Sequence, residues 1–349
     1  MDKIKTALLS YGMSGKVFHA PFLTTHSGFH LHGSWERSKK QIQQDYDGTR
    51  SFNSLKEVLE SDVELIVVNT PNLTHFEYTS ACLTSGKHVV VEKAFTTNAQ
   101  EAIELENLAR KQGVVLTIFQ NRRWDSDFLT VKQILESGKL GPIVEAQFSY
   151  DRYNPVLSPK VHKEIPSHGS GVLKDLGPHL IDQALLSFGL PQAVFADLRI
   201  TRDHSQVEDY FEMILFYPEL RVRLRSGYFV KEPGPAYILH GKNGSFLKNR
   251  SDVQEAALQA GRKPNEPDWG REPDSEAGIL HLNLNGQSVK EKVTSAHGNY
   301  RHFYDQVYGS IRNHGKPPVT TKEGIAVMKI IDAAVQSQAQ GKKVELNFS

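Results

Sequence analysis

The sequence contains very little cysteine: Cys82 is the only one among 349 residues. This excludes an internal disulfide framework and is typical of proteins from a reducing compartment. No uninterrupted apolar stretch approaches the length that crosses a membrane. The N-terminal segment, residues 1–9, lacks the longer apolar run and the small-residue cleavage site of a signal peptide. We therefore expect a cytoplasmic protein with no membrane partner.

An excess of charge of one sign is also missing. Lysine and arginine total 41 and aspartate and glutamate total 40, so the formal net charge is +1. This balance gives no indication of a nucleic-acid partner. No histidines stand at metal-ligand spacing: His30 and His32 alternate on one expected strand, and neither His19 nor His26 shares their period. We expect no bound metal.

The length and composition predict two domains. Hydrophobic residues make up 39% and charged residues 23% of the chain, an ordinary balance for a folded protein. A chain of 349 residues exceeds what one hydrophobic core usually supports. We place the domains at residues 1–120 and 121–349.

The first domain alternates apolar runs with amphipathic segments. Strands are predicted at 4–9, 29–34, 64–69, 89–92 and 114–119, and helices at 54–60, 75–85 and 98–112. For the last helix, Thr97 or Asn98 supplies the N-cap, and Gly113 ends it. This alternation predicts right-handed βαβ units and a parallel sheet, as in a Rossmann domain.

In the second domain, strand-like segments follow one another. We predict helices at 126–136, within 169–189, at 300–314 and at 321–340, and strands at 143–152, 193–201, 210–216, 220–228 and 236–240. Residues 261–276, rich in proline, glycine and charge, are expected to form a surface loop. The pattern predicts an α+β domain built on a large, mostly antiparallel sheet with helices on one face. An exposed face of that sheet would be an oligomer contact.

A glycine-containing loop follows the first strand and precedes helix-like sequence. This is the position of G-x-G-x-x-G in a dinucleotide-binding fold, where the backbone approaches the pyrophosphate at the helix N-terminus. Ser10 stands where the first glycine is expected, so the match is partial, and such loops also occur as plain strand–helix turns. The context favours a dinucleotide site. Its residues are Tyr11, Gly12, Met13, Ser14 and Gly15.

The end of the second strand leaves the choice of cofactor open. A carboxylate at Glu36 would bind the ribose 2′-hydroxyl of NAD. Arg37 and Lys39, with the Ser38 hydroxyl, would instead hold the 2′-phosphate of NADP. A solvated charge cluster at a strand end is the alternative to both. The sequence leaves NAD and NADP equally open.

Another polar loop follows the apolar run at 64–69. Loops at the carboxyl ends of parallel strands line the ligand crevice. The candidate cofactor contacts are Asn69, Thr70, Pro71 and Asn72, with His75 stacking nearby. A proline-stabilised turn, with Asn72 or Thr74 capping the next helix, is the alternative.

Two further motifs carry candidate chemistry. Glu92 and Lys93 end a buried strand, where a lysine would face the nicotinamide and stabilise a developing alkoxide. The alternative is a lysine that is simply exposed at the strand end.

Pro178 is suited to a first helical turn, so His179 would lie near a helix N-terminus, whose dipole keeps the ring neutral. Asp175 would orient His179 or relay its proton. The alternative is that Asp175 caps a helix and His179 packs in a satisfied site.

Together these motifs resemble the Gfo/Idh/MocA oxidoreductase family over nearly the whole chain. The shared features are the glycine loop, the strand ending in Glu-Lys, and the later D-x-x-x-H followed by Asp182. Residues 121–125 (NRRWD) resemble the start of the family's substrate domain, and residues 320–324 (TTKEG) resemble the start of its final helix. The segments YGMSGKVFHAPF, NRRWDSDFL and SYDRYNP are most similar to the branch of NADP-dependent scyllo-inositol dehydrogenases.

The resemblance implies an NAD(P)-dependent dehydrogenase of a polyol or sugar, assembled as a homodimer or homotetramer through its C-terminal sheet. By motif position, Lys93, Asp175 and His179 match the family's catalytic residues. His179 would take the hydroxyl proton with help from Asp175, and Lys93 would stabilise the alkoxide while hydride passes to the nicotinamide C4. Ala94 departs from the family's usual proline, and we expect a looser turn there.

A polyol substrate needs several directional donors and acceptors. The candidate substrate contacts are Arg122, Trp124, Asp125, Tyr153 and Asp182. A helix-start ion pair on a packed aromatic explains the Arg-Trp-Asp string equally well. Two other functions stay open: a dinucleotide-binding regulatory or sensor protein without turnover, and a sugar-processing enzyme that retains its cofactor. The presence of all three expected catalytic residues favours the dehydrogenase.

Overall fold

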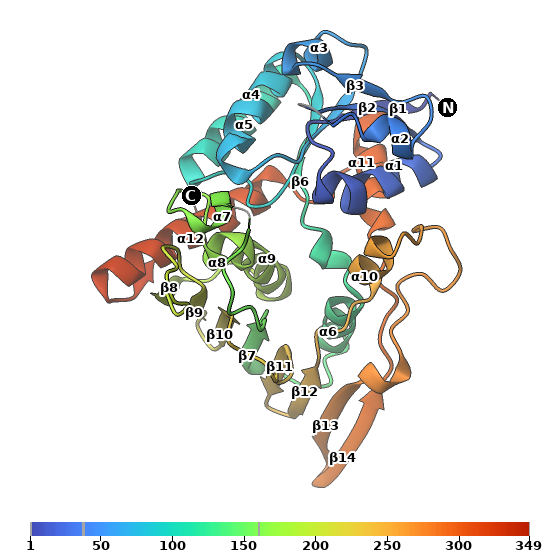
Figure 1. Ribbon diagram of the computed structural model, residues 1–349. Helices are drawn as coiled ribbons and strands as arrows, with labels where there is room; N and C mark the ends of the chain where they lie inside the picture. Colours follow the sequence, from blue (N-terminus) through green and yellow to red (C-terminus); the bar gives the residue numbers. More distant parts are fainter. Residues whose placement is uncertain (1, 37–38, 160, 349) are drawn as a thin grey trace. The chain divides into compact units, whose positions relative to one another are not determined.

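The computed structural model describes residues 2–36, 39–159 and 161–348 (Figure 1). The chain forms two compact units, and each is assembled from separate stretches of sequence. The first unit comprises Met1–Asn121, Gln254–Trp269 and Asn299–Ile325. The second comprises Arg122–Val253, Gly270–Gly298 and Ala326–Ser349. Arg37 and Ser38 lie outside the described residues.

The first unit is built on a parallel sheet of six strands in the order β3-β2-β1-β4-β5-β6. The strands are β1 (Ile4–Leu8), β2 (Phe29–Trp35), β3 (Arg50–Phe52), β4 (Leu65–Val68), β5 (His88–Val91) and β6 (Leu116–Ile118). The strand order reverses between β1 and β4, the point at which sheets of this type bind ligands. The predicted Rossmann sheet is confirmed. The short strand β3 was missed by the sequence analysis.

Helices follow most of these strands. They are α1 (Ala20–Thr25), α2 (Ile42–Asp45), α3 (Leu55–Leu59), α4 (His75–Thr84) and α5 (Ala99–Gln112), joined by α10 (Gln254–Gln259) and α11 (Arg301–Arg312) from later in the chain. All residues of β4 are buried, as expected of a strand covered on both faces. The Asn98 side chain accepts a hydrogen bond from Glu101 N, and Gly113 ends α5 with a φ of 67°, so both predicted caps of this helix are confirmed.

The second unit is built on a nine-stranded sheet in the order β14-β13-β12-β11-β7-β10-β9-β8-β15. Its strands are β7 (Ile143–Ser149), β8 (Ala193–Arg199), β9 (Tyr210–Phe216), β10 (Arg221–Gly227), β11 (Tyr237–Gly241), β12 (Gly244–Lys248), β13 (Gly278–Leu284), β14 (Gln287–Val293) and β15 (Val344–Glu345). Only the β7–β10 pair within this sheet is parallel, so the mostly antiparallel sheet is confirmed. The strands β12 to β15 were missed.

Side chains alternate across this sheet. In β9, Phe211, Met213 and Leu215 are buried, and the residues between them are partly exposed. The helices of the unit are α6 (Ser126–Glu136), α7 (Val161–Glu164), α8 (Val172–Asp175) and α9 (Gly177–Phe188), and α12 (Thr321–Gln340) runs from the first unit into the second. Because α9 packs on β7 and β10, and α6 on β12, the apolar face is the helix-covered face.

The segment 261–276 is largely the exposed loop that its composition predicts, but two of its side chains are anchored. It is irregular, but Trp269 and Glu272 are buried. The Trp269 indole donates a hydrogen bond to Gln254 Oε1 at 3.0 Å, and Glu272 forms an ion pair with Lys248 at 2.7 Å. Trp269 and Glu272 are therefore buried through partners outside the segment, although the proline, glycine and charge of the segment predict exposed side chains.

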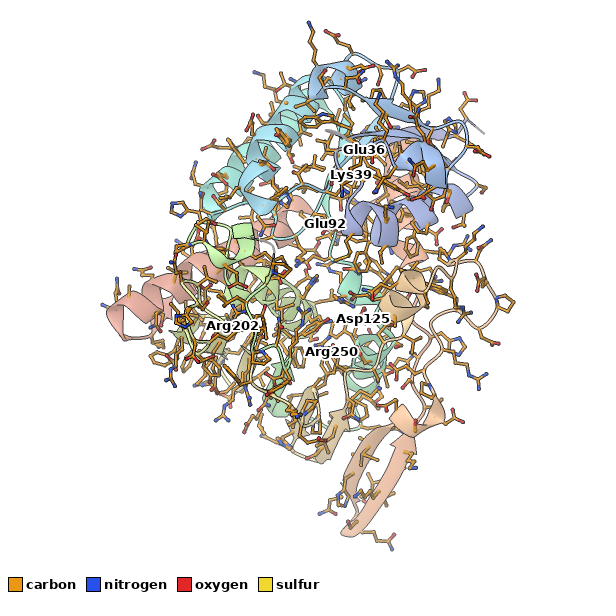
Figure 2. All side chains as sticks on the ribbon, viewed as in Figure 1. Glu36, Lys39, Glu92, Asp125, Arg202 and Arg250 are labelled. Atoms are coloured by element: carbon orange, nitrogen blue, oxygen red, sulfur yellow. The ribbon has the colours of Figure 1, made fainter. Side chains whose placement is uncertain are left out.

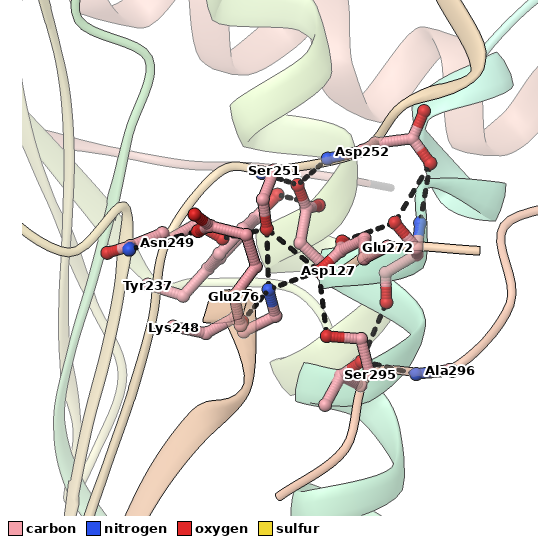
Figure 3. Close-up of polar contacts among 12 residues, drawn as sticks. Asp127, Tyr237, Lys248, Asn249, Ser251, Asp252, Glu272, Glu276, Ser295 and Ala296 are labelled. Atoms are coloured by element: carbon pink, nitrogen blue, oxygen red, sulfur yellow. Dashed lines mark hydrogen bonds and ion pairs between the residues drawn. The ribbon is translucent and has the colours of Figure 1, made fainter. Parts of the chain in front are cut away.

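A buried polar cluster in the second unit joins the start of α6 to the loop after β12 (Figure 3). Asp127 Oδ2 accepts hydrogen bonds from the backbone N–H groups of Ser251 (2.8 Å) and Asp252 (3.1 Å). Asp252 Oδ2 in turn accepts one from Ser126 N at 2.8 Å, at the first residue of α6. Lys248 and Glu272 are both fully buried beside these groups. The cluster fixes the segment 249–252 to α6.

The described ranges were considered for membrane-spanning helices and for clusters of metal-binding side chains. None of their helices is long and apolar enough to cross a membrane. None of their histidine, cysteine, aspartate and glutamate side chains gather in a group of three or more that is arranged to hold a metal ion.

Candidate functional site

The loop after β1 is anchored to the end of β4. Ser10 N donates to Asn69 Oδ1 at 3.0 Å, and Asn69 Nδ2 donates to Ser10 O at 2.7 Å. A Cβ atom on Gly15 would lie 2.5 Å from Ser10 O, so only glycine allows the chain to return this closely. Gly12 is exposed, and a Cβ there would meet nothing nearer than Ser10 Oγ at 3.6 Å. Gly12 therefore leaves its backbone open to a ligand, whereas Gly15 is required for packing.

Tyr11 braces this loop from its buried side. Its hydroxyl donates to Asp45 Oδ2 at 2.8 Å, and Lys16 Nζ pairs with the same oxygen at 3.1 Å. Burial, and then the hydrogen bond to Asp45, raise the pKa of Tyr11, so the hydroxyl remains a donor. Helical backbone begins at Met13, whose side chain is exposed. The first N–H groups of a helix have no partner within the helix and are suited to bind an anion.

Glu36 follows β2, and its carboxylate is engaged within the protein (Figure 2). It accepts hydrogen bonds from the N–H groups of Gln41 (3.1 Å) and Ile42 (3.3 Å) and from the Ser51 hydroxyl (3.2 Å). The carboxylate thus satisfies the start of α2, where negative charge is favourable. Lys39 is exposed. Arg37, the other candidate at this strand end, is outside the described residues.

His75 joins two loops at the carboxyl edge of the sheet. Its Nε2 lies 2.9 Å from Thr70 O, and its Nδ1 lies 2.7 Å from Ala94 O. The ring is fully buried, and burial lowers the pKa of His75 although the two carbonyls act in the opposite direction. In this arrangement His75 braces the loop that carries Thr70, Pro71 and Asn72. At the start of α4, Thr74 makes no side-chain cap hydrogen bond.

Glu92 links the end of β5 to the glycine loop. Its Oε1 accepts a hydrogen bond from the Ser14 hydroxyl and lies 3.1 Å from His19 Nε2, and its Oε2 accepts one from Lys93 N at 3.2 Å. His19 Nδ1 lies 2.6 Å from the Tyr304 hydroxyl, which completes the partners of the buried ring. Although burial acts to raise the pKa of Glu92, His19, Ser14 and Lys93 lower it to about 2. Glu92 is therefore an anion that holds the loop.

Lys93 is the second residue after β5 and is half-buried. The Lys93–Ala94 peptide bond is cis. Ala94 is buried, and its carbonyl oxygen lies 2.7 Å from His75 Nδ1. The strand ends that carry Ser10, Asn69 and Lys93 belong to the neighbouring parallel strands β1, β4 and β5, so they share one edge of the sheet.

In the second unit, α8 ends at Asp175 and α9 starts two residues later. Pro178 occupies the first turn of α9, so the predicted position of His179 at a helix N-terminus is confirmed. The N-cap position of α9 is Leu176, which makes no side-chain cap hydrogen bond. Asp175 Oδ2 lies 3.5 Å from Lys163 Nζ. This partner was missed by the sequence analysis, since nothing in the pattern marks Lys163.

The short helix α7 that carries Lys163 is held by a buried arginine. Arg202 donates to Asp209 Oδ2 and to Glu164 Oε2, both at 2.9 Å, and its side chain is almost fully buried (Figure 2). It also donates to Val156 O at 3.3 Å. Arg202 therefore fixes α7 and the segment before it, and α7 carries the Lys163 that pairs with Asp175.

The candidate substrate residues near α6 have partners within the second unit. The Asp182 carboxylate accepts two hydrogen bonds from the Arg123 guanidinium, at 2.6 and 2.8 Å. Arg122 Nη1 lies 3.7 Å from Asp125 Oδ1, and Trp124 is buried. The ion pair beside a packed aromatic is thus present, although it does not exclude a ligand contact by the same residues.

Tyr153 differs from the other candidates because its side chain is exposed. It forms an isolated bridge with Phe229, and Lys231 Nζ lies 5.3 Å from its ring centroid. It lies three residues after Tyr150, in the segment that follows β7.

Models of one protein family match both the N-terminal and the C-terminal part of the chain. The family model described as the NAD-binding Rossmann fold of the Gfo/Idh/MocA oxidoreductase family matches residues 4–120. The model for the C-terminal alpha/beta domain of the same family matches residues 132–346.

Relatives match along nearly all of the chain. The scyllo-inositol 2-dehydrogenase (NADP(+)) IolW of Bacillus subtilis is 38% identical over 347 residues, which cover 99% of this chain and 97% of that protein. A 1,5-anhydro-D-fructose reductase of Ensifer adhaerens is 24% identical over 85% of this chain and 84% of that protein. The solved structure of yvaA from Bacillus subtilis superposes with a TM-score of 0.96 at 38% identity over 99% of each chain. A Bacteroides fragilis structure is 41% identical, with a TM-score of 0.90, over 99% of this chain and 100% of that chain.

Proposed function

Because the chain belongs to the Gfo/Idh/MocA oxidoreductase family, we propose that it transfers hydride between NADP(H) and a secondary alcohol or ketone of a cyclic polyol or sugar. The observation that carries this proposal is the bond between Glu92 and the Ser14 hydroxyl. It joins the strand end of Lys93 to the glycine loop, so an amine and a dinucleotide loop stand at one sheet edge.

The residues of the first unit fit a dinucleotide. Gly12 leaves its backbone accessible, and the helix that starts at Met13 offers N–H groups to a pyrophosphate. Thr70, Pro71 and Asn72 would line the same edge. The nicotinamide, when bound, supplies the acceptor or donor of hydride at its C4.

We propose NADP(H) as the preferred form. The Glu36 carboxylate already accepts three hydrogen bonds within the protein, which leaves it poorly available to a ribose 2′-hydroxyl. The cations Arg37 and Lys39 of the same strand end suit a 2′-phosphate. The NADP specificity printed in the name of the Bacillus subtilis relative supports this choice.

The residues of the chain would divide the chemistry as follows. His179 takes the proton from the substrate hydroxyl oxygen, and Lys93 stabilises the negative charge that develops on that oxygen. Asp175 orients His179, and its ion pair with Lys163 favours the ionised carboxylate. In the reductive direction, His179 returns the proton to the same oxygen. The names of the relatives support a cyclic polyol or sugar as substrate: scyllo-inositol for one and 1,5-anhydro-D-fructose for the other.

We also propose that the open face of the large sheet forms a homodimer or homotetramer contact in a cytoplasmic protein. Phe195, Ile214 and Phe216 on that face are partly exposed. Apolar side chains grouped on a sheet face are a typical association surface. Size-exclusion chromatography with light scattering would measure the number of subunits.

Absorbance of the reduced nicotinamide tests the function. The protein would be mixed with NADP or NAD and a panel of inositols, aldoses and anhydro-sugars. We expect reduction of NADP with at least one substrate, lost in Lys93→Met and kept in Lys56→Met, which removes an exposed lysine of the same unit. Tight NADP binding without turnover of any substrate would contradict the dehydrogenase and favour a sensor protein.

A further inference from the structure

Three guanidinium groups surround one aromatic ring directly after β7. The Cζ atoms of Arg250, Arg152 and Arg122 lie 4.2, 5.1 and 5.7 Å from the ring centroid of Tyr150. Stacking on an aromatic face stabilises each cation separately. It does not remove the repulsion among like charges held this close together. The arrangement therefore gathers three guanidinium groups at one point of the second unit.

Arg250 is the most enclosed of the three. Its side chain is only 17% exposed and also lies against the Tyr237 ring at 4.9 Å. Its Nε and Nη2 donate to the backbone carbonyl of Ser149 at 3.3 and 3.1 Å. Asp125 Oδ2 is 3.8 Å from Nη1, which is beyond hydrogen-bond distance (Figure 2). Across the described ranges, no carboxylate forms a hydrogen bond with Arg250.

The chain holds Arg250 in place by its neighbours in sequence. Ser251 N and Asp252 N both donate to Asp127 Oδ2, and the Tyr237 hydroxyl donates to Asp127 Oδ1 at 3.2 Å (Figure 3). Both the backbone of the loop and the ring on which Arg250 stacks are thus tied to α6. A cation fixed in this way is preorganised for a ligand and loses little entropy on binding.

The nearby carboxylates act on the cluster electrostatically: Asp127 and Asp125 on Arg250, and Asp175 on Arg152. Asp125 is shared, since it lies 3.7 Å from Arg122 and 3.8 Å from Arg250. For Arg152, the described part of the chain provides no ion pair within 4 Å. Although burial acts to lower the pKa of Arg152, its partner Tyr150 and the nearby Asp175 raise it, so the group stays charged beside a proposed catalytic residue.

We propose that Arg122, Arg152 and Arg250, gathered around Tyr150, bind an anionic group of the substrate, a carboxylate or a phosphate carried by the sugar or polyol. Guanidinium groups donate hydrogen bonds and accept none, and their planar forks match the paired oxygens of these anions. Neutral hydroxyls are better served by mixed donors and acceptors. The inference rests on the proposed function, because it names the substrate class of that same enzyme.

Three hexoses that differ only at C6 test the proposal: D-glucose, D-glucuronate and D-glucose 6-phosphate. Calorimetric titration into the NADP-loaded protein measures their affinities without turnover. We expect one or both anions to bind at least about 10-fold more tightly than glucose, with the advantage decreasing at high salt. Arg250→Met is expected to remove this preference, whereas Arg223→Met, an exposed arginine of β10, keeps it. Arg152→Gln, at an exposed position, serves as a second variant if Arg250→Met does not fold.

Several results would overturn the anion site. They are equal affinity for glucose and both anions, absence of binding by all three sugars, and a loss of affinity in Arg250→Met that is the same for the neutral and the charged sugars. Other results would contradict only one of the two proposals. Anion-selective binding without any cofactor reduction would contradict the dehydrogenase and support the anion site. Turnover of neutral polyols that is unaffected by Arg250→Met would support the dehydrogenase and contradict the anion site.

Discussion

Glu92 and His19 form a buried contact in which the carboxylate oxygen Oε1 lies 3.1 Å from the ring nitrogen Nε2. The ring is completely buried, and each of its nitrogens has a partner: Nε2 faces the Glu92 carboxylate, and Nδ1 lies 2.6 Å from the Tyr304 hydroxyl. The pair connects the helix after the glycine loop to the strand end that carries Lys93. Its integrity should therefore be visible both in stability and in cofactor binding.

The first prediction concerns acid stability. The pKa of Glu92 is lowered to about 2, below its ordinary value, so the ionised carboxylate stabilises the native state above the ordinary pKa. This contribution, on the order of 3 kcal/mol at most, is lost as the pH falls from about 4.5 towards 2. Urea unfolding should show that Glu92→Gln loses less stability than the wild type between pH 6 and pH 3. The exposed Glu60→Gln should follow the wild type, and parallel curves for all three proteins would refute the prediction.

The second prediction assigns His19 a positioning role. His19→Leu removes a hydrogen bond to a charged group, which typically contributes about 1.5–3 kcal/mol to stability. It also releases Glu92 from the helix that follows the glycine loop. NADP affinity, measured by fluorescence titration, should fall about 10-fold. His19→Gln keeps a donor for Glu92 and should restore part of the affinity. Equal loss in both variants, with equal loss of stability, would indicate a packing role alone.

The third prediction separates the two glycines of the loop. In Gly15→Ala the new Cβ would lie 2.5 Å from Ser10 O, a backbone atom that cannot yield easily, and the protein should lose about 1–3 kcal/mol of stability. In Gly12→Ala the nearest atom is 3.6 Å away, so the fold should be unaffected. NADP affinity should nevertheless fall, because a methyl group would stand where the pyrophosphate approaches. Thermal unfolding and titration together check the pair, and normal NADP binding by Gly12→Ala would place the pyrophosphate elsewhere.

The fourth prediction concerns the ion pair of Lys163 with Asp175. Loss of the ammonium raises the pKa of a neighbouring carboxylate, so Lys163→Met should shift the acid limb of kcat/KM to higher pH. The shift should be less than about one pH unit, because both side chains are partly exposed and solvent screens the pair. Lys139→Met, an exposed lysine of the same unit, is the matched control. An unchanged limb would show that Asp175 does not titrate in the reaction.

The fifth prediction decides what Asp182 does. Its carboxylate is paired with Arg123 and buried, so Asp182→Asn should destabilise the protein by about 3–5 kcal/mol. The double variant Arg123→Met/Asp182→Leu should lose less than the two single changes together, because neither charge is left alone. Urea unfolding measures both. Unchanged stability with a large loss of kcat/KM in Asp182→Asn would instead support direct contact with substrate.

Local pattern was sufficient for the elements with strong periodicity. The helix Ala99–Gln112 carries both of its caps in its own sequence, and the buried strands β4 and β5 are continuous apolar runs. The strand β14 was missed because its residues are polar and exposed (QSVKEKV). It is a strand only through its pairing with β13, which periodicity does not report.

The sequence by itself determined the elements with strong periodicity, the family resemblance, and the positions of Lys93 and His179 near the ends of their elements, because those properties depend on neighbouring residues. Only the tertiary structure decided the partners of these groups. His19 and Tyr304 meet across 285 positions, and Arg250 reaches the Ser149 carbonyl beside Tyr150 across 101. Such contacts depend on how distant elements pack and on which buried polar groups must be satisfied, and neither is encoded in local spacing.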